Sequence, residues 1–561
     1  MKISGAQIVV NCLLEQGVDT IFGFPGGAVL NIYDALYAYK DRIRHILTCH
    51  EQGAAHAADG YARSTGRTGV VISTSGPGAT NLVTGIATAH MDSVPMVAIT
   101  GNVNCSLLGR DSFQEVDITG ITTPITKHNF IVKNIEELAS TLRKAFAIAN
   151  SGRPGPVLVD IPKDITAAVT EYLPKNPEAV APPSVLPALD EASALLVHAK
   201  KPFIFAGGGT IISQASASLY KFAQKIDAPV ALSLMGLGGF PPDDPRFTGM
   251  LGMHGSKVSS YAIDQCDLLV ALGTRFSDRV LCIAKSFAPH AKILHIDIDP
   301  AEINKNIQVT ASVAGDLNVV LEGLLRILPD DITHPEWMQK ISALKAEFPI
   351  DRPFKKSNMP YEILSTLNEL EPDAFITTEV GQHQMWAGQY FHFSRPRQFV
   401  TSGGLGTMGY GLGAAIGVQA AHPDHRVINV AGDGSFYMNL NELATTVSYK
   451  LPIIELVMNN NVLGMVHQWQ QMFYEEHYSH SILNRQTDLS ALATAFGVEP
   501  FTIRESTDIR PVLQKALACG KPCLINCLIP SEEIVLPMVP AGQAVSNPIL
   551  YLEKEENGET H

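Results

Sequence analysis

Short apolar runs alternate with helical patterns along most of the chain. Each run has the length of a buried strand and is bounded by Gly or Pro. The predicted strands lie at 69–73, 95–100, 156–160, 202–206, 267–272, 292–297, 426–430 and 523–527. Strands that are apolar on both faces belong to parallel sheets covered by helices on either side. The pattern therefore predicts an α/β fold built from doubly wound parallel sheets.

Two stretches interrupt this alternation, at about 170–190 and at 327–360. Both are polar, contain several prolines and lack hydrophobic periodicity, which is typical of linkers. A chain of 561 residues is also too long for a single hydrophobic core. We therefore expect three α/β domains and a tail, at 1–168, 190–328, 361–530 and 531–561.

The first and third domains share an internal pattern. In the first, a strand leads to Gly76-Pro77-Gly78, then to a helical segment and Pro95. In the third, a strand leads to Gly432-Asp433-Gly434, then to a helical segment and Pro452 at nearly the same spacing. Such a repeat predicts two copies of one fold. The loop of the third domain differs by a carboxylate, which suggests that it holds something charged.

Composition and charge exclude several classes of protein. Hydrophobic residues make up 46% of the chain and the formal net charge is −14, without a basic face that could neutralise phosphates. Nucleic acid is therefore not expected as a partner. No apolar run reaches the length of about 18 residues that a membrane helix needs, and the first residues lack the features of a signal or transit peptide. We expect a soluble, cytoplasmic protein that binds no membrane.

Candidate chemistry gathers at the ends of two predicted strands in the third domain. Gly432-Asp433-Gly434-Ser435 opens a helix after one strand, and Asn460 follows the next strand. Glycines at a helix start suit a phosphate group, and a carboxylate beside an amide oxygen suits Mg²⁺. Each motif alone is most often a plain turn or loop. Together, they favour a site for a metal ion and a diphosphate.

At this point the sequence resembles the thiamin diphosphate enzymes, whose signature is GDG followed by NN. Within them it is most similar to the family of acetohydroxyacid synthase (acetolactate synthase) catalytic subunits, from about residue 4 to 548. The motifs that carry the resemblance include Phe24-Pro-Gly-Gly-Ala28, His50-Glu-Gln-Gly-Ala54, Ser75-Gly-Pro-Gly-Ala-Thr-Asn81, Asp111-Ser-Phe-Gln-Glu115, Gly381-Gln-His-Gln-Met-Trp386 and Ser402-Gly-Gly-Leu-Gly-Thr-Met-Gly409.

The resemblance implies a carboligase. Such an enzyme decarboxylates pyruvate and condenses the hydroxyethyl carbanion with a second small 2-ketoacid. Pyruvate then gives 2-acetolactate and 2-ketobutyrate gives 2-aceto-2-hydroxybutyrate, in branched-chain amino-acid biosynthesis. The implied cofactors are thiamine diphosphate, Mg²⁺ and FAD, the last without a redox role. Two rivals stay open: a flavin-dependent pyruvate oxidase and a catalytically inactive scaffold subunit.

The same resemblance implies roles for individual residues. The expected catalytic group is Glu51, Gly27, Phe113, Gln114 and Lys163, and Trp469 is expected to select the second substrate. Residues expected at thiamine diphosphate are Val380, Gln382, His383, Gly406, Met408, Gly432, Gly434, Ser435 and Met465. The metal ligands would be Asp433, Asn460 and Val462, the last through its carbonyl. FAD would be bound by Arg153, Gly207, Gly208, His254, Arg275, Arg279, Asp297 and Asp316.

Some of these residues also have plainer interpretations. Lys163 could be an ordinary surface charge and Trp469 a helix-packing side chain. The glycine-rich turn at 206–210 departs from GxGxxG and is by itself weak evidence for a dinucleotide. The resemblance also places Glu51 and Asp433 of one site on different chains. It therefore implies a homodimer or homotetramer with its active site between subunits, and a regulatory small subunit.

Overall fold

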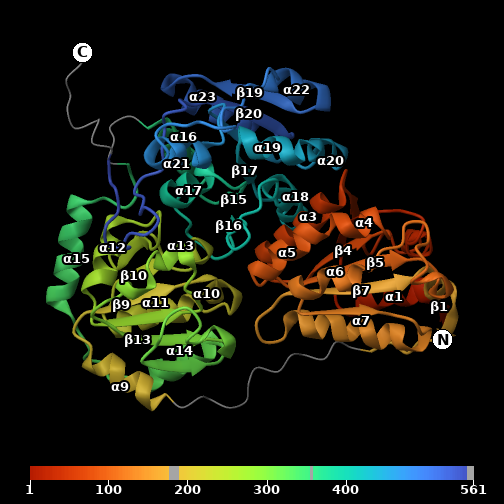
Figure 1. Ribbon diagram of the computed structural model, residues 1–561, viewed down its shortest axis with the longest axis horizontal. Helices are drawn as coiled ribbons and strands as arrows, with labels where there is room; N and C mark the ends of the chain where they lie inside the picture. The colour runs from red at the N-terminus through yellow and green to blue at the C-terminus, as the bar shows by residue number, and fades with distance from the viewer. Residues whose placement is uncertain (176–188, 354–357, 552–561) are drawn as a thin grey trace.

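The computed structural model describes residues 1–175, 189–353 and 358–551. Within them, three six-stranded sheets form three units, each flanked by helices. We call them the N-terminal unit (1–175), the middle unit (189–353) and the C-terminal unit (358–551). Figure 1 shows the C-terminal unit above the other two. The α/β fold of parallel sheets is confirmed.

The strands of each sheet run parallel to their neighbours. In the N-terminal unit they are β2 (Thr20–Phe24), β3 (Arg44–Leu47), β4 (Gly69–Ser73), β5 (Met96–Asn102), β6 (His128–Ile131) and β7 (Pro156–Pro162). In the middle unit they are β9 (Pro202–Ala206), β10 (Val230–Leu232), β11 (Phe247–Met250), β12 (Leu268–Leu272), β13 (Lys292–Asp297) and β14 (Ala311–Ala314). In the C-terminal unit they are β15 (Phe375–Thr378), β16 (Phe399–Val400), β17 (Val427–Gly432), β18 (Ile454–Asn459), β19 (Glu499–Ile503) and β20 (Cys523–Leu528).

Helices cover both faces of each sheet. The N-terminal unit has α1 (Gly5–Glu15), α2 (Leu30–Tyr37), α3 (Glu51–Thr65), α4 (Pro77–Asn81), α5 (Val83–Met91), α6 (Ile118–Thr122), α7 (Ile135–Asn150) and α8 (Lys163–Ala167). The middle unit has α9 (Asp190–His198), α10 (Gly208–Ile212), α11 (Ser216–Lys225), α12 (Lys257–Gln265), α13 (Asp278–Leu281), α14 (Leu317–Ile327) and α15 (Pro335–Glu347). The C-terminal unit has α16 (Met359–Leu370), α17 (Gln382–Tyr390), α18 (Gly411–Ala421), α19 (Asp433–Asn439), α20 (Leu443–Ser448), α21 (Gly464–Phe473), α22 (Leu489–Phe496) and α23 (Ser506–Ala518).

The order of strands distinguishes the units. In the N-terminal unit it is β3-β2-β4-β5-β7-β6, and in the C-terminal unit β16-β15-β17-β18-β20-β19. These two orders are identical when the strands are counted along the chain, as the internal repeat predicts. The middle sheet instead runs β11-β10-β9-β12-β13-β14, which is the order of dinucleotide-binding folds. In all three sheets, the direction in which strands are added reverses beside the strand that comes first along the chain (β2, β9 and β15). Sheets of this type bind ligands at the carboxyl edge of that point.

Local sequence explains why α7 forms where it does. The side chain of Asn134 caps its first turn, where Glu136 and Glu137 also complement the helix dipole. Its apolar face is buried against the sheet through Leu138, Leu142, Ala145, Phe146 and Ala149, which recur at helical spacing.

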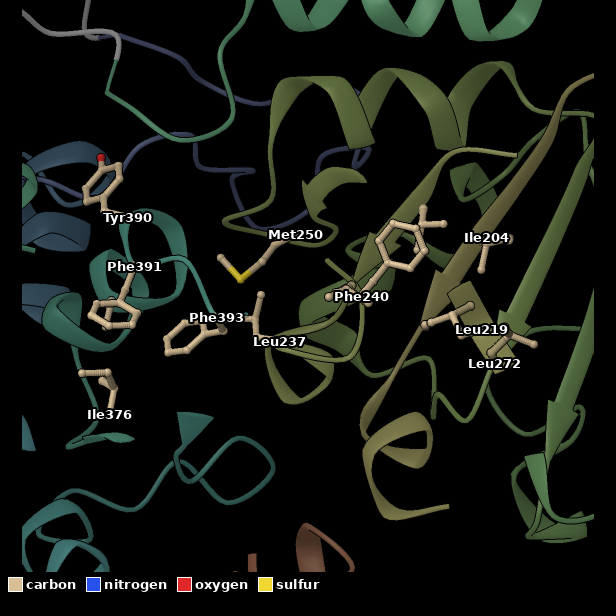
Figure 2. Packing of buried hydrophobic residues seen from close by; sticks show 14 of the residues in the cluster. Ile204, Leu219, Leu237, Phe240, Met250, Leu272, Ile376, Tyr390, Phe391 and Phe393 are labelled. Atoms are coloured by element: carbon tan, nitrogen blue, oxygen red, sulfur yellow. The ribbon is translucent and has the colours of Figure 1, made fainter. Parts of the chain in front are cut away.

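Two hydrophobic clusters join the units. One is shared by the middle and C-terminal units, and Figure 2 shows Leu237 and Met250 of the former beside Phe391 and Phe393 of the latter. The other cluster is shared by the N-terminal and C-terminal units, where α3 packs on α18. A Cβ atom added to Gly417 would collide with the backbone carbonyl of Ala57, so only glycine allows this close approach.

The expected linkers need correction. The segment 327–360 contains the helix α15, which packs on α12 and belongs to the middle unit. Its Trp337 is buried and donates a hydrogen bond from Nε1 to the carbonyl of Pro202 at 2.9 Å. In the first stretch, Val169–Glu171 forms β8, which pairs antiparallel with β1 (Lys2–Ser4). Most of the remaining stretch, 176–188, lies outside the described residues.

Among the described residues, no helix is both long and apolar enough to cross a membrane.

If α15 is an integral part of the middle unit, its contacts must stabilise that unit. We expect Trp337→Ala to lower the free energy of unfolding by about 3–5 kcal/mol, because it removes a large buried side chain. Denaturant unfolding followed by circular dichroism measures this. The exposed neighbour Gln339 provides the control, and Gln339→Ala should change stability little. Equal stability of both variants would contradict the placement of α15.

Candidate active site

The carboxyl edge of the C-terminal sheet brings Asp433 and Asn460 together. Gly432 of β17 pairs with Met458 of β18, so the residues that follow these strands lie side by side. Oδ1 of Asp433 is buried and has no hydrogen-bond partner among the described residues. Burial raises the pKa of Asp433 to about 6, although Arg485 and the backbone N–H of Asn460 oppose this shift. A buried carboxylate oxygen without a donor is what a metal ligand requires before its ion binds.

A narrow cradle surrounds this carboxylate. A Cβ atom on Gly432 would lie 2.7 Å from Nδ1 of His383, and one on Gly434 would lie 2.7 Å from Leu463. Nε2 of His383 is buried without a partner among the described residues, and burial lowers the pKa of this imidazole to about 3. Ser435 donates its hydroxyl to the carbonyl of Gly432 at 3.1 Å. The backbone N–H groups at the start of α19 and a neutral imidazole are groups that suit a diphosphate.

The side chain of Gln382, which is expected at thiamine diphosphate, has protein partners within this chain. Its Nε2 donates to Oε1 of Gln468 and to the carbonyl of Glu533, both at 3.0 Å. Its Oε1 accepts a 3.2 Å hydrogen bond from Nδ2 of Asn460. Both amide hydrogens thus have protein acceptors, so Gln382 orients Asn460 and leaves no hydrogen for a phosphate.

The third expected metal ligand is the carbonyl of Val462. Val462 forms an isolated antiparallel bridge with Ile482. The flanking hydrogen bonds run from Leu463 to Ser481 and from Leu483 to Asn461. Val462 is therefore a non-hydrogen-bonded position of that ladder, which leaves its carbonyl available as an oxygen ligand. The oxygens of Asp433, Asn460 and Val462 fit Mg²⁺ better than a softer metal.

A cavity of about 2730 Å³ lies at the junction of the three units. Typical sites for a single ligand measure about 300–1,000 Å³, so there is room for more than one molecule. Met408 lines it, and the Cε atom of this residue lies 3.9 Å from the position of a Cβ atom on Gly434. The cavity therefore borders the cradle around Asp433. Four more residues expected at the cofactor or substrate line it: Val380, Gly406, Met465 and Trp469.

The middle unit forms the other end of the cavity. Gly207 follows β9 and Gly273 follows β12, at the point where the winding of this sheet reverses. A Cβ atom on Gly207 would collide with the carbonyl of Gly273, so the two loops meet closely. The expected FAD residues lining the cavity are Arg153, Gly207, Gly208, His254, Arg275, Arg279, Asp297 and Asp316.

Several of these side chains already have protein partners. Arg153 forms ion pairs with Asp299 at 3.3 Å and with Glu302 at 2.7 Å. Asp316 caps α14 by accepting a hydrogen bond from the N–H of Val319 at 3.1 Å. Burial raises the pKa of Asp297 to about 6. Arg279 forms a long ion pair with Asp278 at 3.8 Å, and its side chain is 67% exposed, so its guanidinium can still reach a phosphate.

The N-terminal unit carries a separate set of expected residues. Asn81 donates from Nδ2 to Oε2 of Glu51 at 2.9 Å. A Cβ atom on Gly78 would lie 3.1 Å from Oε1 of Glu51, and one on Gly76 would lie 2.8 Å from the carbonyl of Gln114. Glu51 and Gln114 therefore both border the turn after β4. Gly27 follows β2, the neighbouring strand at the reversal point of this sheet.

This second set does not meet the cavity within one chain. Glu51 begins α3, whereas Arg63, near the end of the same helix, lines the cavity. These two positions are about 18 Å apart along the helix axis. None of Gly27, Glu51, Phe113, Gln114 and Lys163 lines the cavity in the described part of the chain. Phe113 is 86% exposed, which is unusual for a large apolar residue.

The structure also reveals a residue that the sequence analysis missed. Glu379 directly follows β15, is fully buried and precedes Val380. Its carboxylate accepts hydrogen bonds from the N–H groups of Gly409 at 2.6 Å, Gly411 at 2.9 Å and Leu412 at 3.2 Å. It thereby fixes the chain just after Met408. A carboxylate directly after the short strand-like run Phe375–Thr378 was the available signal.

Comparisons with known proteins agree with this geometry. The chain matches three models of the thiamine pyrophosphate enzyme family. The N-terminal TPP binding domain matches residues 3–121, the central domain 189–324 and the C-terminal TPP binding domain 379–527.

Curated relatives match over nearly the whole chain. An acetolactate synthase large subunit from Parasynechococcus marenigrum is 46% identical, over 97% of this chain and 90% of the relative. The acetolactate synthase isozyme 2 large subunit of Escherichia coli is 45% identical, over 97% of this chain and 99% of the relative. A probable acetolactate synthase large subunit from Methanocaldococcus jannaschii is 45% identical, over 97% of this chain and 95% of the relative.

The burial of Glu379 makes a pH-dependent contribution to stability. Burial raises its pKa from 4.5 to about 7, so the fold disfavours the ionised form. The free energy of unfolding should therefore fall as the pH rises from about 4.5 to about 7, by up to about 3 kcal/mol. Glu379→Gln should remove this decrease of the unfolding free energy with pH, because the amide does not ionise. Denaturant unfolding between pH 4.5 and 8 measures it, with Glu336→Gln, at an exposed position, as the control. An unchanged slope in Glu379→Gln would contradict the assignment.

Proposed function

Because the chain belongs to the thiamine pyrophosphate enzyme family, we propose that it is the large subunit of an acetolactate synthase. The reaction joins the two-carbon unit left by decarboxylation of pyruvate to a second 2-ketoacid. Pyruvate gives 2-acetolactate, and 2-ketobutyrate gives 2-aceto-2-hydroxybutyrate, in branched-chain amino-acid biosynthesis. The observation that carries this proposal is the similarity to acetolactate synthase large subunits over 97% of the chain. This similarity favours an acetolactate synthase over the two rivals, a pyruvate oxidase and an inactive scaffold subunit.

The residues of the C-terminal unit fit the cofactor of this family. Bound thiamine diphosphate would supply the electron sink that decarboxylation of a 2-ketoacid needs. Asp433, the side-chain oxygen of Asn460 and the carbonyl of Val462 would hold Mg²⁺ against its diphosphate. The unpartnered Oδ1 of Asp433 supports this assignment. Met408 would support the rings of the cofactor from the cavity wall.

Glu51 would exchange a proton with the aminopyrimidine ring. Asn81 occupies Oε2 of its carboxyl group, which leaves Oε1 as the atom that holds or releases the proton. Gln114 and Phe113 would lie at the reacting centre, and Lys163 would attract the carboxylate of the 2-ketoacid. All four residues belong to the N-terminal unit.

We further propose that each active site forms between two chains. Support comes from the distance along α3 between Glu51 and the cavity, and from the exposed ring of Phe113. A second chain, related by twofold symmetry, would bring its Glu51 to the Asp433 of the first. The smallest active form would then be a homodimer.

FAD is proposed for the middle unit, without a redox role. The strand order of this sheet, the glycine loops after β9 and β12 and the exposed Arg279 support it. The size of the cavity would accommodate FAD together with thiamine diphosphate. The relatives are named large subunits, so a regulatory small subunit is also proposed as a partner.

Mixed dimers test the site between chains. Glu51→Gln should abolish acetolactate formation because no carboxyl group exchanges the proton, and Asp433→Asn because the metal ion loses its charged ligand. When the two variants are co-expressed, half of the dimers are mixed and each mixed dimer holds one intact site. Activity should then return to about a quarter of the wild-type value.

Product assays with pyruvate, Mg²⁺ and thiamine diphosphate measure this return. Each variant expressed alone is the control, and circular dichroism shows whether it is folded. If the site lay within one chain, every chain of the mixture would carry a defect. The mixture would then be as inactive as each variant alone.

Trp469 provides a second test. An indole beside the cavity can discriminate an additional methyl group, which is worth about 1–3 kcal/mol. We expect Trp469→Leu to lower the preference for 2-ketobutyrate over pyruvate by about tenfold. Competition between the two ketoacids, with both products quantified, measures it. Tyr474→Leu, which alters another aromatic residue lining the cavity, is the matched control. A product ratio unchanged by Trp469→Leu would assign Trp469 to helix packing alone.

A further inference from the structure

Residues 402–410, here called the Met408 loop, form part of the wall of the cavity. Ser402, Gly403, Gly404, Leu405, Gly406 and Met408 line it. The loop is rich in glycine, and Gly406 and Gly409 have φ angles of 69° and 85°. Leu405 is 43% exposed, so the hydrophobic core holds the middle of the loop weakly. Something else must hold Met408 in position.

The main anchor is Asp92, which ends α5 in the N-terminal unit. Its Oδ1 accepts a hydrogen bond from the N–H of Gly404 at 2.7 Å, and its Oδ2 accepts one from Gly403 at 3.0 Å. Arg63 of α3 donates to the same Oδ2 at 3.0 Å and forms an ion pair with Asp59 at 2.5 Å. The side chains of both aspartates are fully buried. Hydrogen bonds to a buried, ion-paired carboxylate are among the stronger ones in proteins.

Two further contacts hold the other end of the loop. The hydroxyl of Thr88 on α5 lies 2.8 Å from that of Thr407, and both residues are buried. The hydroxyl of Tyr410 donates to Oδ1 of Asp59 at 2.6 Å. The N-terminal unit therefore grips the loop on both sides of Met408. The contacts come from the C-terminal halves of α3 and α5, whereas Glu51 is the first residue of α3.

We propose that Asp92 is a positioning residue, which holds the Met408 loop of its own chain in the arrangement that accepts thiamine diphosphate. This inference rests on the proposed function, because that function places Met408 at the cofactor. Each N-terminal unit would then serve two sites. Its Glu51 would act in the site shared with the partner chain, while its Asp92 shapes the site that contains its own Met408. Without the carboxylate, the loop would populate other conformations, and the apparent affinity for the cofactor would fall with the competent fraction.

Asp92→Asn tests this in the full-length protein. The variant keeps the size of the side chain but replaces one acceptor oxygen by an NH₂ group. This donor would then face another donor, either the guanidinium of Arg63 or a backbone N–H of the loop. Hydrogen exchange in peptides covering 402–410 should accelerate, while exchange in β17 and β18 stays unchanged. The apparent Kd of thiamine diphosphate with Mg²⁺, measured by quenching of tryptophan fluorescence, should rise by about tenfold or more. At saturating cofactor, kcat should stay close to that of the wild type, because binding restores the competent loop.

Asp19→Asn is the matched control, since Asp19 pairs with Arg67 at 2.6 Å in the same unit but does not touch the loop. Cofactor affinity and exchange in 402–410 should both stay at wild-type values there. If Asp92→Asn folds and leaves both quantities unchanged, the positioning role of Asp92 is wrong. A lower kcat with unchanged cofactor affinity would also overturn it.

Thr88 gives an independent test should Asp92→Asn fail to fold. Thr88→Val removes the hydroxyl at constant shape, whereas Thr88→Ser keeps it. Weaker cofactor binding in Thr88→Val alone supports anchoring of the loop by α5, and equal binding in both variants overturns it. Cofactor affinity and hydrogen exchange are both measured without turnover. Wild-type protein that binds thiamine diphosphate but forms no acetolactate would therefore refute the proposed function and not the role of Asp92.

Discussion

Close packing of α3 on α18 is the contact on which the rest of the arrangement depends. Glycines on both helices allow their backbones to touch, because a side chain at Gly60 or Gly417 would collide with the opposite helix. This contact fixes the direction of α3. The end of the helix with Arg63 meets the cavity, and the end with Glu51 faces away from it. One straight helix thus separates two groups that the proposed chemistry requires in one site, and a second chain would resolve this separation.

Burial controls the electrostatics at the carboxyl edge of the C-terminal sheet. It raises the pKa of Asp433 and Glu379 and lowers that of His383. These groups differ in how they are compensated. Glu379 is surrounded by backbone N–H donors, whereas Asp433 and His383 each keep one buried atom without a partner among the described residues. The carboxylate of Glu379 is satisfied by backbone donors, and the atoms without partners would be satisfied by the ligands of the proposed function.

Much of the architecture was predictable because parallel strands buried on both faces leave a clear pattern. Strands β4, β9 and β13 match the predicted ranges, and the repeat of two domains is visible in the strand order. The prediction of a linker at 327–360 was wrong. The polar helix α15 buries little more than Trp337 and Ile341, so its stability comes from contact with the middle unit rather than from its own sequence. A segment of that kind has no strong local signal.

The sequence by itself determined where glycine turns and polar residues follow the strands, because these are local features. Asp433 and Asn460 could be paired from the parallel sheet alone. Only the tertiary structure decided that Gln382 orients Asn460, that Glu379 binds the backbone after Met408, and that Asp92 holds the loop from another unit. These contacts join residues distant in sequence across packed helices. Their hydrogen bonds depend on the relative placement of whole units, which no local pattern records.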